Sequence, residues 1–156
     1  MTEKKRTVYI AAAGTGGHVM PGLAVARELK ARGWEVAWLG TTTGMESDLV
    51  GREGIPFMGL NFQGVRGRGL LGAVKGGLKL IQAFFAARSV LAEARPTIIF
   101  STGGYIAVPV GFAARSLGIP LVMMNCDADL LMSTNTLLKV CQAVACGFAG
   151  GARSFA

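Results

Sequence analysis

The sequence predicts a protein of the α/β class, in which a parallel β-sheet carries helices on both faces. Two observations support this prediction. Short apolar runs rich in β-branched residues alternate with longer helical patterns along the chain. Three of the expected helices also end at a glycine, at Gly33, Gly54 and Gly118, and a proline follows the last two within two residues. Glycine supplies the left-handed C-cap there, and proline stops the helix before the next strand.

The expected elements alternate strictly. Strands are predicted at residues 7–12, 35–39, 56–60, 97–101, 120–124 and, from a weaker pattern, 143–146. Helices are predicted at residues 21–31, 45–53, 70–94, 108–117 and 135–140. The chain has 156 residues, no internal linker and no repeat, so residues 1–156 are expected to form one domain.

The composition restricts the class of protein and its partners. Half of the residues are hydrophobic and 16% are charged, which argues against disorder. The net charge of +7 suits nucleic acid, an anionic membrane or phosphorylated ligands. No nucleic-acid reader motif and no interleaved exposed aromatic residues accompany the charge, so we expect no nucleic-acid partner. The three cysteines lack metal-ligand spacing, which predicts no zinc site, no disulfide framework and a reducing cytoplasm.

Two segments imitate targeting signals. Residues 4–6 are basic and precede an apolar run at 8–13, but that run is shorter than the core of a signal peptide. Residues 7–26 are uncharged, yet four glycines and a proline interrupt them. Such a segment is a poor membrane-spanning helix, so a soluble domain is expected.

The loop after the first strand has the composition of an anion site. Its residues are Gly14, Thr15, Gly16, Gly17 and His18. Small residues let a phosphate approach the backbone, and the N–H groups at a helix start favour negative charge. Val19 breaks the dinucleotide pattern GxGxxG, and no nucleoside-triphosphate loop is present. The alternative is a plain tight turn, with Pro21 near the first turn of the helix.

His18 is the single histidine of the chain. At a helix N-terminus the positive end of the dipole favours the neutral imidazole, which can accept a proton from a sugar hydroxyl or bind a phosphate. The alternative is a structural histidine.

Two more loops follow strands at the same predicted edge. Gly103, Gly104 and Tyr105 form a second glycine-rich turn, which either completes a diphosphate site or only lets the next helix pack closely. Asp127 follows the fifth strand and is a candidate base, although loop aspartates often cap helices instead.

The segment from residue 66 to residue 95 is basic and apolar, with six cationic residues and one acidic residue. On a helical wheel Leu71, Val74, Leu78, Ile81 and Phe85 form one stripe. Such a helix either lies on an anionic bilayer or is a core helix with a solvated lysine edge. The residues expected to contact the bilayer are Arg66, Arg68, Leu70, Leu71, Lys75, Lys79 and Phe84.

Taken together, these motifs resemble the peptidoglycan N-acetylglucosaminyltransferases of glycosyltransferase family 28. The likeness extends from about residue 8 to about residue 150 and rests on the two glycine loops and on two further motifs, residues 38–41 and 64–69. It implies a Rossmann-like domain that is one half of a GT-B fold, namely the N-terminal, acceptor-binding half, with the C-terminal donor domain absent from these residues.

The resemblance also implies a reaction and its partners. N-acetylglucosamine would pass with inversion from UDP-N-acetylglucosamine, held by a donor-binding domain or subunit, to a lipid-linked muramoyl-pentapeptide. The glycine loops with Asn135 would contact the acceptor diphosphate, His18 and Asp127 would be catalytic, and no metal or cofactor is implied. The expected location is the cytoplasmic face of the bacterial inner membrane. The alternative is a non-catalytic, membrane-associated subunit of a split glycosyltransferase.

The sequence departs from the family pattern at two places. Met124, Asn125, Cys126 and Asp127 stand where the family usually has His-Glu-Gln-Asn, and Asn135 matches a family asparagine only with a shift of one residue. Ala12, Ala13 and Gly14 replace the commoner Ala-Gly-Gly.

Overall fold

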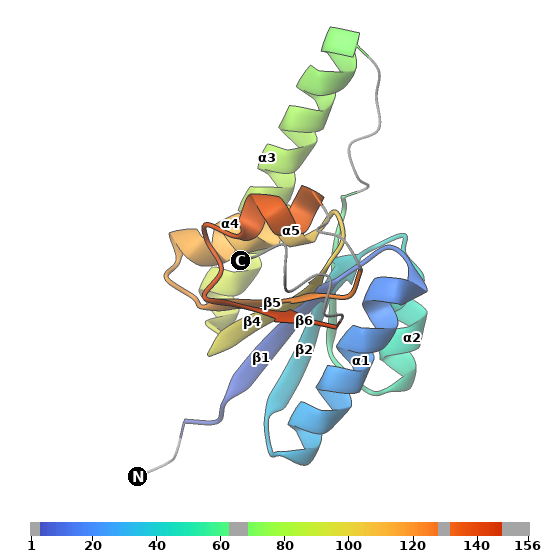
Figure 1. Cartoon of the computed structure of the whole chain (residues 1–156), viewed down its shortest axis with the longest axis vertical. Coiled ribbons are helices and arrows are strands. Elements are labelled where there is room, and N and C mark those ends of the chain that lie inside the picture. Colours follow the sequence, from blue (N-terminus) through green and yellow to red (C-terminus); the bar gives the residue numbers. More distant parts are fainter. Residues whose placement is uncertain (1–3, 63–68, 128–131, 148–156) are drawn as a thin grey trace.

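The computed structural model describes residues 4–62, 69–127 and 132–147 (Figure 1). Its centre is a six-stranded parallel sheet with the strand order β3-β2-β1-β4-β5-β6. The strands are β1 (Thr7–Ala12), β2 (Glu35–Thr41), β3 (Phe57–Leu60), β4 (Ile98–Gly103), β5 (Leu121–Asn125) and β6 (Ala143–Cys146). The predicted Rossmann-like class is therefore confirmed.

Helices cover both faces of the sheet (Figure 1). They are α1 (Gly16–Ala31), α2 (Glu46–Arg52), α3 (Gly69–Ala94), α4 (Ala107–Ser116) and α5 (Met132–Leu137). The chain reverses direction across the sheet between β1 and β4, so the loops that follow these two strands lie side by side. Ligands of open parallel sheets bind at this kind of switch point.

Alternate residues of β1 serve two separate cores, as the period of a strand requires. Val8 and Ile10 pack in a cluster with residues of α1, whereas Tyr9 and Ala11 pack in a cluster with residues of α3 and α4. Trp38 belongs to the first cluster and is completely buried. Its Nε1 donates to the carbonyl of Ala12 at 3.0 Å. The buried indole N–H is thus satisfied, as burial requires.

Two expected helices were placed wrongly. Helix α1 begins at Gly16 rather than at residue 21, because Thr15 takes the N-cap position and its carbonyl accepts from His18 N and Val19 N at 3.0 and 3.2 Å. Pro21 therefore lies inside the helix and not near its first turn. Helix α5 spans Met132–Leu137 and not residues 135–140.

Helix α3 is held to the body by small residues. Its buried positions are Gly76, Ala83, Ala87 and Leu91. The N-terminal half of the helix rises beyond the rest of the domain (Figure 1). Since α3 follows β3, this projecting end lies on the side of the sheet where the parallel strands end.

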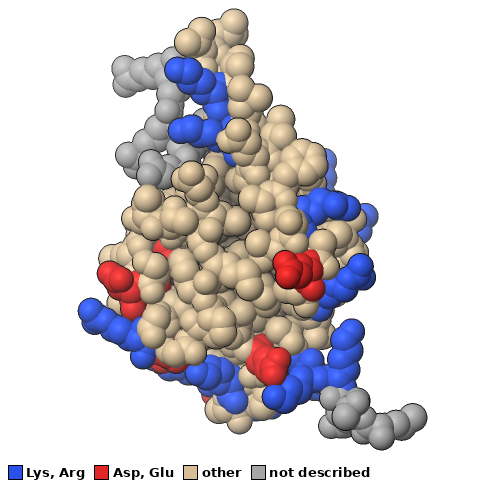
Figure 2. All heavy atoms as spheres, turned by 180° about the vertical axis from the view of Figure 1, so that it is seen from behind, with Lys and Arg blue, Asp and Glu red and all other residues tan. Residues whose placement is uncertain are grey.

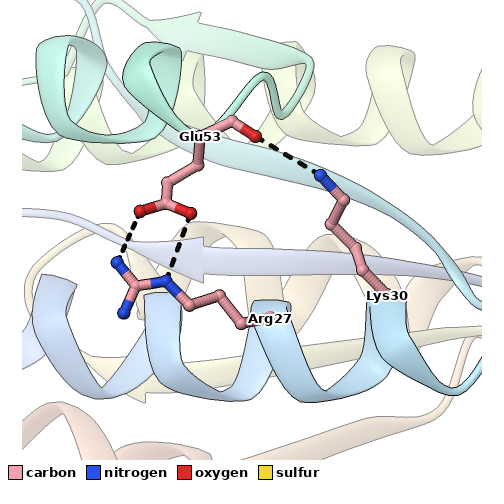
Figure 3. Close-up of polar contacts among 3 residues, drawn as sticks. All are labelled: Arg27, Lys30 and Glu53. Atoms are coloured by element: carbon pink, nitrogen blue, oxygen red, sulfur yellow. Dashed lines mark hydrogen bonds and ion pairs between the residues drawn. The ribbon is translucent and has the colours of Figure 1, made fainter.

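An ion pair joins α1 to the end of α2. The guanidinium of Arg27 binds both carboxylate oxygens of Glu53, and Lys30 Nζ donates to the carbonyl of Glu53 at 3.3 Å (Figure 3). The hydrogen bond from Arg27 lowers the pKa of the Glu53 carboxyl. The ion pair thus links α1 to the C-cap residue of α2 at the surface of the domain.

Candidate functional site

The two glycine-rich loops meet through a pair of hydrogen bonds. His18 Nδ1 lies 3.1 Å from the carbonyl oxygen of Thr102, and the hydroxyl of Thr102 donates to the carbonyl oxygen of His18 at 2.7 Å. Thr102 is buried, and His18 is half-buried. The first turn of α1 is thereby fixed to the end of β4.

This contact determines the tautomer of His18. A carbonyl oxygen only accepts hydrogen bonds, so Nδ1 must carry the proton that it donates. In the neutral ring, Nε2 then keeps its lone pair and is available to accept a proton. The contact thus fixes the orientation of the ring and directs Nε2 away from the carbonyl of Thr102.

An irregular register brings Thr102 to this position. Ala11 of β1 pairs with Ser101, but Ala12 pairs with Gly103, so Thr102 is the extra residue of a bulge. Ser101 Oγ supports the bulge, since it donates to the carbonyl of Ala11 at 2.8 Å and accepts from Gly103 N at 3.2 Å.

Gly104 makes the close approach of the loops possible. It has φ +86°, and a Cβ placed there would lie 2.6 Å from the carbonyl oxygen of Ala13. The close contact at Gly104 is therefore with the first loop, and not with the following helix. On the other loop, a Cβ at Gly14 would lie 3.4 Å from Tyr105 Cε1, so the phenol ring packs over that loop.

The first loop presents free backbone donors. Within the described residues, the N–H groups of Gly14, Thr15, Gly16 and Gly17 have no protein acceptor. Helix α1 has no acidic residue in its first turn, so nothing in that turn neutralises the positive end of its dipole. The space beside Gly16 is open, because a Cβ there would meet no atom within 4 Å. An anion has both room and donors at this end of α1.

Tyr105 and Phe62 form an aromatic wall beside the loops. Their ring centroids lie 5.9 Å apart, with the ring planes inclined by 55°. Tyr105 is 36% exposed and Phe62 is buried. No role was predicted for Phe62, which belongs to no motif, or for Thr102, which lies in the second glycine-rich loop, because their contacts join segments that are distant in the sequence.

The loop after β5 contributes a buried polar group. Asn125 Nδ2 donates to the main-chain carbonyl of Asp127 at 2.9 Å, which folds the loop back on the end of the strand. The Oδ2 atom of Asp127 is buried and has no hydrogen-bond partner within the described part of the chain. Burial, and then the charge of Asp127, raise the pKa of the Cys126 thiol, which disfavours a nucleophilic thiolate. Asn135 is exposed on α5.

The apolar stripe of α3 faces outward. Leu71, Val74, Leu78, Ile81 and Phe85 are each 55–73% exposed. The stripe itself is therefore not buried in this domain, whereas the C-terminal half of the helix contributes Ala87 and Leu91 to the core. Phe84, in contrast, is only partly exposed and packs against the core.

Basic side chains accompany the stripe. Leu70 is 87% exposed, and Lys75 and Lys79 are exposed on the same helix. Figure 2 shows basic and no acidic side chains on this view of the projecting part of the molecule. Arg66 and Arg68 lie outside the residues that the structure describes.

By length and composition, α3 is the one described helix apolar enough to cross a membrane. Its C-terminal half packs against α4 and the sheet through Ala83, Ala87 and Leu91.

The described residues contain no group of three or more His, Cys, Asp or Glu side chains placed to hold a metal ion.

Comparison with known proteins identifies the family of the chain. Residues 8–146 match the model of the glycosyltransferase family 28 N-terminal domain. The chain is 52% identical over 147 residues to the UDP-N-acetylglucosamine–N-acetylmuramyl-(pentapeptide) pyrophosphoryl-undecaprenol N-acetylglucosamine transferase of Chromobacterium violaceum, and the match covers 94% of this chain and 41% of the relative. The transferase of the same name from Herminiimonas arsenicoxydans is 48% identical, with 92% and 40% covered.

Solved structures agree with this relationship. The crystal structure of Acinetobacter baumannii MurG superposes with a TM-score of 0.84 at 38% identity, over 94% of this chain and 43% of that one. A UDP-N-acetylglucosamine 2-epimerase superposes with a TM-score of 0.71 at 13% identity, over 94% of this chain and 43% of that one, a likeness of fold alone. The chain thus spans about two fifths of the length of these relatives. It belongs to glycosyltransferase family 28 and corresponds to the N-terminal domain of that family.

Proposed function

We propose that this domain binds the lipid-linked diphosphate acceptor of a MurG-like N-acetylglucosaminyltransferase. The observation that carries the proposal is the junction of the two glycine loops. Free N–H groups at the start of α1 lie beside an imidazole whose Nε2 atom is available to accept a proton. A diphosphate needs the first feature, and deprotonation of a sugar hydroxyl needs the second.

Each loop has a part in this proposal. Residues 14–17 and Gly104 bind the diphosphate, and Tyr105 closes the site beside Phe62. Asn135 remains a predicted acceptor contact. The C4 hydroxyl of the acceptor sugar attacks the anomeric carbon of UDP-N-acetylglucosamine, the carbon–oxygen bond to UDP breaks, and the hydroxyl proton passes to His18 Nε2. Asp127 is the second candidate for that proton.

The partners follow from the names of the relatives and from the surface of α3. The relatives are named as transferases of N-acetylglucosamine to a pyrophosphoryl-undecaprenol acceptor. A donor-binding domain or subunit holds UDP-N-acetylglucosamine. The exposed stripe and lysines of α3 rest on an anionic membrane, which places the enzyme at the cytoplasmic face of the bacterial inner membrane.

The test of the site is a titration of the ¹⁵N-labelled domain with inorganic diphosphate, followed by amide NMR. We expect the largest shift changes at residues 14–17 and at Gly104. Sulfate at matched ionic strength controls for the net charge of the domain. Changes confined to the basic N-terminal residues 4–6 would refute the proposed site.

The test of activity adds a donor-binding domain in trans and measures transfer to lipid-linked muramoyl-pentapeptide. If transfer is restored and depends on His18, the result supports the proposal that this domain is the acceptor-binding half of the enzyme. Restored transfer that is insensitive to the glycine loops and to His18 supports the alternative, a non-catalytic membrane-associated subunit.

A further inference from the structure

An open apolar groove lies between α3 and α4. Its volume is about 530 Å³. Every residue that lines it is apolar: Leu80, Ile81, Phe84, Phe85, Val108, Pro109 and Phe112. Phe85 and Phe112 are 61% and 38% exposed, so large aromatic surfaces face water at its walls. A groove without polar groups selects an apolar ligand and offers nothing to orient a polar one.

The groove begins close to the candidate diphosphate site. Val108 is the second residue of α4, whose N-cap Ile106 directly follows Tyr105. The second glycine loop therefore leads directly into the helix whose first turn lines the groove, and Tyr105 of that loop also lies against Gly14 of the first loop. A ligand whose anionic head lies on the loops has its adjoining tail at the entrance of the groove.

The groove also continues toward the projecting end of α3. Ile81 and Phe85 belong both to the groove and to the exposed stripe, which continues through Leu78 and Val74. Lys79 lies one turn from this wall and is exposed. An apolar path thus leads from the diphosphate loops to the surface that we expect to meet lipid.

We propose that this groove binds the first isoprene units of the acceptor's polyprenyl chain, next to the diphosphate. This inference rests on the proposed function. It assigns the lipid of the acceptor, and not an acyl chain of the surrounding bilayer, to the space between α3 and α4. The domain would then recognise the acceptor by its head and by the start of its tail together.

The experiment compares dissociation constants of inorganic, dimethylallyl, geranyl and farnesyl diphosphate, measured by calorimetry below their aggregation limits. We expect affinity to rise about tenfold with each added isoprene unit, because each unit buries further apolar surface. Ile81→Ser and Phe112→Ser should flatten that rise and leave inorganic diphosphate unaffected. Both side chains are partly exposed, and circular dichroism checks that the variants fold.

Val74→Ser is the matched comparison, because it removes an exposed residue of the same stripe outside the groove. It should weaken vesicle binding and keep the dependence on chain length. Equal affinity for all four diphosphates would contradict the proposal that the groove binds the prenyl chain, and would still support the diphosphate site. The same holds if Ile81→Ser and Phe112→Ser weaken only vesicle binding, since bilayer acyl chains would then be the occupant.

If inorganic diphosphate fails to bind, the proposed function fails instead. Geraniol and farnesol then test the groove by themselves, since a prenyl site should still bind farnesol more tightly and lose that preference in Phe112→Ser. Absence of any preference would exclude a prenyl site.

Discussion

His18 and Thr102 are 84 residues apart in sequence and exchange two hydrogen bonds, one through each carbonyl oxygen. The imidazole donates in one direction and the buried hydroxyl donates in the other. Each residue therefore fixes the main chain of the other's loop. The geometry of the candidate site depends on this pair more than on any single glycine.

Thr102→Val tests the pair. Valine keeps the shape of the side chain but removes the hydroxyl that donates to the carbonyl of His18, which costs about 1–3 kcal/mol when the acceptor is buried. The main-chain carbonyl that accepts from the imidazole remains, but the loop that carries it loses one of its two bonds to α1, so we expect kcat in the reassembled enzyme to fall roughly 10- to 100-fold. Thr102→Ser keeps the hydroxyl and should restore the rate. Equal rates for valine and serine would show that the bond is structural only.

His18→Ala tests the imidazole itself. Loss of a general base lowers turnover by about 10²- to 10⁴-fold. The side chain is half-buried, so the melting temperature should change little. His18→Asn, which can still donate to Thr102, separates the loss of proton transfer from the loss of loop geometry. Unchanged kinetics in both variants would remove His18 from the site.

Gly104→Ala tests the close contact between the loops. Gly118 provides a matched control, because it also has a positive φ, +68°, but a Cβ there meets no atom within 4 Å. Gly118→Ala should cost only the conformational strain, about 1–2 kcal/mol. Gly104→Ala adds the overlap with the carbonyl of Ala13, so its free energy of unfolding should fall by about 1–3 kcal/mol more. Denaturant titration measures both, and equal losses would mean that the loops can separate freely.

The lysines of α3 are tested by Lys75→Glu combined with Lys79→Glu. Each basic residue near an anionic bilayer contributes about 1 kcal/mol, so the double reversal should weaken vesicle binding at least about 30-fold. Arg52→Glu with Lys139→Glu changes the net charge equally at exposed positions on other elements. Sedimentation with anionic vesicles compares the two, and similar losses would indicate a general charge effect.

The ion pair between α1 and α2 predicts a pH dependence of stability. Arg27 lowers the pKa of Glu53, so the pair contributes stability above the ordinary pKa of a glutamate and loses it as pH falls through the lowered value. Arg27→Gln should therefore lower the melting temperature near neutral pH. As the pH falls through the lowered pKa of Glu53 and the carboxyl is protonated, the difference between the variant and the parent should disappear. A difference that persists below that pKa would assign the effect to packing.

The order of the helices and strands was predictable from the sequence, but several contacts between them were not. Alternating apolar runs and glycine-proline exits are local signals, and they located all eleven elements to within a few residues. The start of α1 was missed because Gly16 and Gly17 have low helix propensity, yet both belong to the helix in the structure. The bulge at Thr102 depends on pairing between β1 and β4, which no local pattern reports.

The stripe of α3 shows a different limit of prediction from sequence. Periodicity identified the residues that share one side of the helix, but a buried side and a lipid-facing side are both apolar. The small residues Gly76, Ala83 and Ala87 form the side that packs closely on the body, so the stripe is the outward side.

One uninterrupted helix joins the exposed stripe to the interior of the domain. Leu71 is 73% exposed, whereas Leu91, twenty residues later on α3, is completely buried. They are separated by about 30 Å of continuous helix, whose backbone hydrogen bonds make it stiff. If the stripe rests on lipid, as we propose, α3 would hold the glycine loops at a fixed distance from the headgroups. Acceptors would then be selected by the distance of their reactive sugar from the bilayer.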